Sequence, residues 1–128
     1  MDFDLPYTEQ VDYEGLLDHA RKNYDSFTLV WRAGMKFSEK AEAIKKELAP
    51  FLIEESRRNA WPGTESSGEP SIVSEYRVSK QSVEVLSRAP SVWAWKFPNF
   101  PEDLAFYRNG KVMFASVAHE QMAWHEKA

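Results

Sequence analysis

The dipeptide Asn109-Gly110 is the feature of this sequence that most constrains the fold. It separates two segments, 104–108 and 111–116, in which aromatic, β-branched and other apolar residues predominate. Asn-Gly readily adopts the two positive φ angles of a type I′ turn, whose twist matches that of the strands it joins. The sequence therefore predicts a tight β-hairpin over these residues, and strands joined in this way are antiparallel.

The rest of the chain alternates between helical and extended patterns. Apolar residues that recur every three or four positions predict helices over residues 9–23, 39–49 and 80–87. Runs of aromatic and β-branched residues predict strands over residues 27–32 and 71–78. Residues 51–55 fit a strand or a further helical turn, and a strand is favoured. Residues 92–97 fit either a strand or a helix, and the segment from Ala118 is expected to begin as a helical turn. We therefore predict one α+β domain over residues 1–128, with an antiparallel sheet of four to six strands and two or three helices packed on one face.

Composition excludes several classes of protein. The 128 residues contain no cysteine, which rules out disulfides, thiolate metal sites and cysteine nucleophiles. The net charge of −4 disfavours a nucleic-acid binder, because such proteins usually carry a basic surplus. The sequence begins with acidic residues and has no run of about 20 apolar residues, which predicts a cytoplasmic protein without a membrane partner.

The sequence contains no recognisable catalytic motif. His119 and His125 are six positions apart, about 240° round a helix, so they cannot bind one zinc ion as the two histidines of a zinc protease helix do. There is no nucleophile elbow of the Gly-x-Ser-x-Gly type and no glycine-rich phosphate loop, so we expect neither metal nor cofactor. His119 with Glu120 could form an acid–base pair, but a polar pair that ends a strand is the favoured interpretation.

Aromatic residues are abundant, with 5 Trp, 5 Tyr and 8 Phe. Two of the tryptophans, Trp93 and Trp95, lie in a proline-rich segment that precedes the acidic pair Glu102 and Asp103. Tryptophan is enriched at the centres of protein interfaces. We therefore predict that these four residues form a partner-binding surface.

Four motifs resemble those of a family of small uncharacterised bacterial proteins, some of which are labelled as sporulation-stage proteins. The motifs are Ser26–Arg32 (SFTLVWR), Trp61–Thr64 (WPGT), Pro101–Arg108 (PEDLAFYR) and Ser116–Glu120 (SVAHE). The resemblance implies a bacterial source and a small stand-alone protein, and it directs attention to the polar residues within the motifs. The candidate polar cluster consists of Arg32, Thr64, Arg108, His119 and Glu120.

Three functional hypotheses follow. The favoured one is a non-catalytic binding protein, specifically a bacterial immunity protein that neutralises a basic protein toxin. Its support is the acidic charge, the aromatic surplus and the missing catalytic signature. The alternatives are a small hydrolase or nucleotide-handling enzyme that uses His119 and Glu120, and a regulatory domain that binds a peptide or small ligand.

Overall fold

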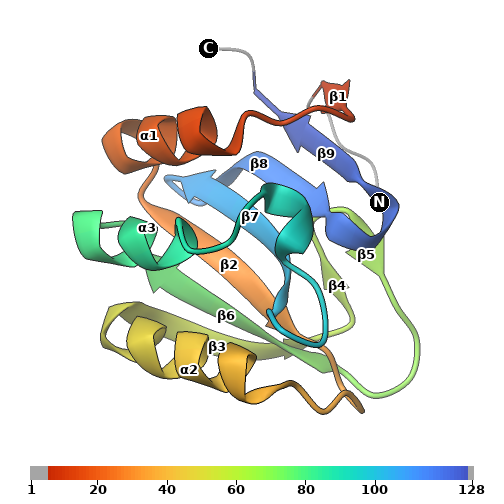
Figure 1. Ribbon diagram of the computed structural model, residues 1–128. Helices are drawn as coiled ribbons and strands as arrows, with labels where there is room; N and C mark the ends of the chain where they lie inside the picture. The colour runs from red at the N-terminus through yellow and green to blue at the C-terminus, as the bar shows by residue number, and fades with distance from the viewer. Residues whose placement is uncertain (1–5, 127–128) are drawn as a thin grey trace.

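The computed structural model describes residues 6–126, which form an α+β fold as expected (Figure 1). The helices are α1 (Tyr13–Asn23), α2 (Glu39–Leu48) and α3 (Lys80–Leu86), with the short 3-10 helices η1 (Ala49–Phe51), η2 (Val92–Ala94) and η3 (Ala118–Glu120). The strands are β1 (Tyr7–Thr8), β2 (Ser26–Trp31), β3 (Leu52–Arg58), β4 (Ala60–Trp61), β5 (Thr64–Glu65), β6 (Ser71–Arg77), β7 (Glu102–Arg108), β8 (Lys111–Val117) and β9 (Met122–His125).

The main sheet has seven strands in the order β1-β9-β8-β7-β2-β6-β3, and each described pairing is antiparallel. The predicted four to six strands were too few, because the short strands β1 and β9 extend one side of the sheet. The helical turn expected at Ala118 is present only as η3, after which the chain returns to the sheet as β9. Residues 92–97 form η2 and irregular backbone rather than a strand.

The predicted hairpin is confirmed. Strands β7 and β8 pair up to Arg108 opposite Lys111. Between them, Asn109 and Gly110 have φ angles of 51° and 77°, both in the left-handed region that a type I′ turn requires.

Local side-chain chemistry fixes where the helices begin. The Asp12 carboxylate accepts a hydrogen bond from the Gly15 N–H at the start of α1, and Ser38 accepts one from Ala41 at the start of α2. Ser79 and Ser82 form a reciprocal capping box at the start of α3. All three helices lie on one face of the sheet, as predicted, whereas β4 and β5 lie behind it (Figure 1).

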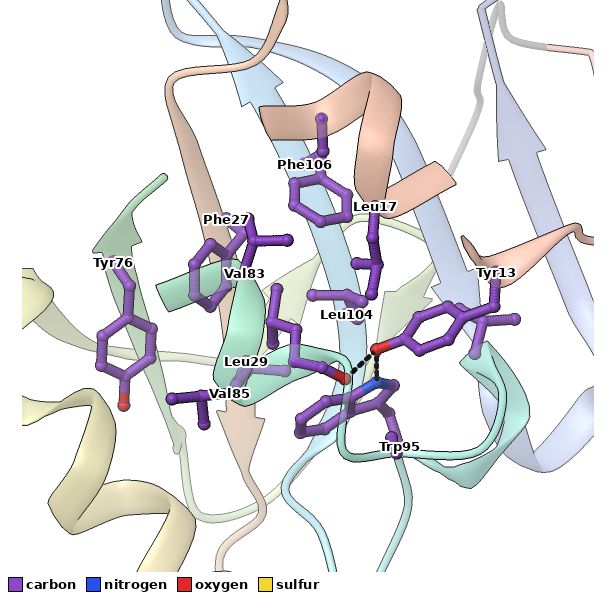
Figure 2. Close-up of a cluster of buried hydrophobic side chains, with 14 of the residues drawn as sticks. Tyr13, Leu17, Phe27, Leu29, Tyr76, Val83, Val85, Trp95, Leu104 and Phe106 are labelled. Atoms are coloured by element: carbon purple, nitrogen blue, oxygen red, sulfur yellow. Dashed lines mark hydrogen bonds between the residues drawn. The ribbon is translucent and has the colours of Figure 1, made fainter. Parts of the chain in front are cut away.

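The main core lies between these helices and the sheet, and Figure 2 shows part of it. Its centre contains a polar contact, because the Tyr13 hydroxyl accepts a hydrogen bond of 2.8 Å from Trp95 Nε1 and donates one of 2.6 Å to the Leu86 carbonyl. Burial raises the pKa of Tyr13, so its hydroxyl stays protonated. The contact ties α1, the end of α3 and the segment after η2 to one another.

The opposite face of the sheet carries a smaller apolar cluster of Val30, Trp61 and Val73. Trp61 comes from β4, which pairs with β5 through the turn at Pro62-Gly63. Gly63 has a φ of 86°, and a Cβ atom there would lie 2.9 Å from Val117 Cγ2. A glycine is therefore needed for this hairpin to pack closely against the sheet.

Candidate functional site

Buried charges gather where β7 begins, and we call Arg32, Trp61, Glu102, Asp103 and His119 the acidic cluster. Glu102 and Asp103 are the first two residues of β7, and both are inaccessible to solvent, with 0% and 2% exposure. Asp103 has a φ of 58°, which is uncommon for a residue other than glycine. The pairing of β2 with β7 shifts register at the same place, between Thr28 and Val30. The strand therefore departs from regular geometry where its two carboxylates enter the protein.

Glu102 accepts hydrogen bonds from three directions. Its Oε2 atom lies 3.0 Å from the Phe97 backbone nitrogen and 2.5 Å from His119 Nε2. Its Oε1 atom lies 3.5 Å from an Arg32 guanidinium nitrogen. A buried carboxylate is tolerated only where such donors replace water. The His119 ring itself is half-exposed, with 45% of its side chain accessible.

Asp103 has a separate set of donors. Trp61 Nε1 donates a hydrogen bond of 2.9 Å to Asp103 Oδ2, and the Ala118 N–H donates one of 3.4 Å to Oδ1. The pKa of Asp103 is raised to about 6, chiefly by burial and also by the nearby Glu102 charge, while the hydrogen bond from Trp61 partly opposes the shift. Asp103 is therefore close to half-protonated near pH 6.

Arg32 connects the two halves of the cluster. Its guanidinium group lies 5.4 Å from the centre of the Trp61 ring, within the range of a cation–π contact, while it also pairs with Glu102. The cluster thus joins β2, β4, β7, η3 and the segment after η2. Its buried acceptors are occupied by internal donors, so its clearest role is to hold these elements together.

The structure separates the residues predicted as a polar cluster. Arg32 and His119 belong to the acidic cluster, and Thr64 lies beside it as the β5 partner of Trp61. Arg108 and Glu120 are exposed and take no part, with Arg108 at the far end of β7.

The predicted partner-binding surface requires correction. Trp95 is completely buried in the main core, and Glu102 and Asp103 are buried in the acidic cluster. Trp93 is half-buried against the same core. Trp95, Glu102 and Asp103 therefore cannot contact a partner in this conformation, since protein atoms already cover them.

A cavity that sequence reasoning missed lies at the other end of the sheet. This α1–β9 pocket has a volume of about 290 Å³ and is bounded by apolar and ionisable side chains, among them Asp12, Leu16, His19, Tyr24, Phe114, His125 and Glu126. Its residues come from α1 and the segments on either side of it, from β8, and from β9 and the residue after it, so no local pattern marks it. The pairing of β1 with β9, which the sequence did not predict, brings its two sides together.

The carboxylate of Glu126, which lines this pocket, is only partly satisfied. Its Oε1 atom lies 3.9 Å from Lys111 Nζ. Its Oε2 atom is buried and has no hydrogen-bond partner among residues 6–126, although the side chain as a whole is 39% exposed. The charge of Glu126 also adds to burial in raising the pKa of Tyr24, which lines the same pocket.

The acidic cluster and the α1–β9 pocket are the two candidate functional sites. Over residues 6–126, no three His, Asp or Glu side chains are grouped to hold a metal ion, and no helix there has the length and apolar character to cross a bilayer. No protein-family model, curated protein or solved structure matches this chain.

Proposed function

We propose that this chain is a non-catalytic binding protein that captures a basic protein, as a bacterial toxin-neutralising immunity protein does. The observation that carries the proposal is the α1–β9 pocket, in which the buried Oε2 atom of Glu126 has no partner among the described residues. A buried carboxylate oxygen without a donor is costly. A donor supplied by a partner would remove that cost on binding.

The chemistry of the pocket fits a lysine or arginine side chain. Leu16, Tyr24 and Phe114 provide apolar surface for the methylene groups of such a side chain, while Asp12 and Glu126 provide negative charge for its head. Asp12 already accepts one hydrogen bond from the Gly15 N–H, so Glu126 is the principal acceptor.

The net charge of the whole chain supports the same partner. A charge of −4 attracts a basic protein over distances of about a Debye length and speeds its association at low salt. This surface replaces the one predicted around Trp93 and Trp95, because Trp95 is buried in the core and Trp93 is half-buried against it.

A titration followed by NMR tests the pocket directly. A lysine tripeptide with blocked ends should shift the amide signals of Leu16, His125 and Glu126, whereas a glutamate tripeptide should not. Glu126→Gln should weaken binding of the lysine tripeptide about tenfold, because a charge-assisted hydrogen bond is lost. The matched control is Glu120→Gln, which removes the same charge from an exposed site outside the pocket. Equal binding by both variants would rule out the pocket.

A second experiment tests neutralisation. Wild-type protein, but not Glu126→Gln, should retain a basic protein from a lysate of the native host at low salt. That protein should stop growth when it is expressed alone and permit growth when the wild-type chain is co-expressed. If the pocket binds lysine methyl ester as tightly as any protein, the chain is instead a small-ligand binder.

The hydrogen bond between Glu102 and His119 favours one alternative, a small hydrolase or nucleotide-handling enzyme. A carboxylate that orients a half-exposed imidazole is the arrangement of many general bases. If chromogenic ester or phosphate substrates are hydrolysed, His119→Ala should abolish that activity while the protein stays folded. If His119 is only structural, the same change should lower the free energy of unfolding by about 1–3 kcal/mol and no hydrolysis should be found in either protein.

A further inference from the structure

Strand β3 is an outer strand of the seven-stranded sheet, and its free edge is open. It pairs with β6 on one side, and no other strand within residues 6–126 pairs with its second side. Six of its seven residues are exposed, including Leu52 at 40% and Ile53 at 54%. An edge of this length with unpaired backbone N–H and C=O groups is a template for a further strand.

The charges along this edge have an unusual order. From Glu54 to Arg58 the strand reads Glu-Glu-Ser-Arg-Arg, so two acids and two bases are arranged symmetrically about Ser56. The pairing with β6 is regular over these five residues, because the register shift lies before them, between Leu52 and Glu54.

We propose that β3 pairs antiparallel with β3 of a second copy of this chain, with the two-fold axis at Ser56. In such a dimer the axis is perpendicular to the sheet and the helices of both copies lie on the same face. One residue of β3 must then lie opposite itself. Centring on a glutamate or an arginine would place like charges in direct contact.

Ser56 is the one uncharged residue between Glu54 and Arg58, and it alone gives complementary pairs. With Ser56 opposite Ser56, Glu54 lies opposite Arg58 of the second copy and Glu55 opposite Arg57. The axis repeats each pair. The ion pair that Arg57 makes within its own copy is weak enough to exchange, because Arg57 and Glu69 are 3.9 Å apart and both are largely exposed. Within the same copy, Arg58 also donates a hydrogen bond of 2.8 Å to Ser56, and Glu55 accepts one of 3.3 Å from Ser74.

In the proposed dimer, residues that lie opposite each other must project to the same face of the combined sheet. The register about Ser56 meets this requirement. Glu55 and Arg57 lie opposite Ser74 and Ile72 of β6, whereas Glu54, Ser56 and Arg58 project to the other face. Each proposed pair joins residues from the same face. The α1–β9 pocket lies toward the opposite edge of the sheet from β3, so the dimer leaves it open.

Charge reversal provides the first test, with mass measured by light scattering during gel filtration. Wild type should be dimeric at high protein concentration. Glu54→Arg with Glu55→Arg should be monomeric, and so should Arg57→Glu with Arg58→Glu. A mixture of these two variants should form a heterodimer, because every position is then again opposite an unlike charge. Glu84→Arg with Glu120→Arg changes the net charge by the same amount as Glu54→Arg with Glu55→Arg, but at exposed sites outside β3, and should stay dimeric.

Cysteine cross-linking tests the register, since the chain has no cysteine of its own. Ser56→Cys should form a disulfide-linked dimer on mild oxidation with diamide, because directly opposite residues are about 4.5–5.5 Å apart at Cα. Glu54→Cys should not, because the two copies of residue 54 would be about 13 Å apart along the strands. A wild-type chain that stays monomeric at millimolar concentration, or equal cross-linking by both variants, would overturn the proposal. Circular dichroism of each variant establishes that it is folded.

Discussion

Glu102 and His119 form a hydrogen-bonded pair of 2.5 Å in which the carboxylate is fully buried and the imidazole is half-exposed. The two residues lie at the start of β7 and in η3, and the neighbouring Asp103–Ala118 bond joins the same two segments. The pair therefore secures the chain where it leaves β8 and turns toward β9. Its strength can be measured separately from any activity.

Glu102→Gln should lower the free energy of unfolding by about 1–3 kcal/mol. The amide has one acceptor oxygen, so it cannot satisfy the Phe97 N–H, His119 and Arg32 together as the carboxylate does. Urea denaturation at neutral pH measures the difference. Glu120→Gln is the control, because Glu120 is exposed and the same change there should alter stability by less than about 0.5 kcal/mol. Similar values for the two variants would show that the pair is not stabilising.

Asp103 should make stability depend on pH between about pH 4 and pH 7. Its pKa is raised to about 6 in the folded chain, from an ordinary value of 3.8. The folded state therefore binds the proton more tightly than the unfolded state, and this contribution is lost as the pH rises through 6. The loss amounts to roughly 3 kcal/mol for a shift of this size.

The variant Asp103→Asn isolates this effect. Asparagine tolerates the left-handed φ of 58° and keeps one oxygen for the Trp61 N–H, but it does not titrate. Relative to wild type, it should therefore become more stable as the pH rises from 4 to 7. Urea unfolding of both proteins across that range gives the difference. A constant difference would mean that Asp103 is ionised throughout.

Tyr13→Phe should destabilise the protein by about 1–3 kcal/mol although it removes a single oxygen atom. The change leaves the Trp95 indole N–H and the Leu86 carbonyl without their partner inside the core. Tyr7→Phe removes the same atom from a residue that is half-exposed and should be close to neutral. Thermal unfolding followed by near-ultraviolet circular dichroism compares the two variants.

Gly110→Val should destabilise the hairpin by at least about 1 kcal/mol. The space at Gly110 is open, so the penalty arises from its φ of 77°, which a β-branched residue adopts poorly. Lys111→Val places the same side chain at the first residue of β8, where extended backbone suits it, and should have little effect. A neutral result at Gly110 would contradict the type I′ turn.

Features encoded by neighbouring residues were predictable from the sequence. The Asn109-Gly110 turn depends on two adjacent residues, and it was confirmed. Strand β9 was not predicted, because Met122–His125 is short and is extended through its pairing with β8 and β1. One of these two partners, β1, lies at the opposite end of the sequence.

The acidic cluster could not be predicted for the same reason, because it too depends on residues that are far apart in the sequence. The adjacent charges of Glu102 and Asp103 suggested an exposed surface, because carboxylates are usually solvated. Their burial depends on donors from Phe97, Trp61, His119 and Arg32, which lie up to 70 positions away. The motif resemblance pointed to Arg32 and His119. Their common partner is Glu102, which the sequence analysis assigned to the partner-binding surface instead.

The place of β2 in the sheet also has a consequence for synthesis on the ribosome. This buried strand, Ser26–Trp31, lies between β6 and β7, and Ser26 pairs with Arg77 on one side and Tyr107 on the other. At roughly 5–20 residues per second, translation leaves β2 without its second neighbour for several seconds. During that interval an uncharged, proline-free and strongly β-forming hexapeptide is open to other nascent chains. Expression at lower temperature or with abundant chaperones should therefore increase the yield of folded protein more than changes at its surface would.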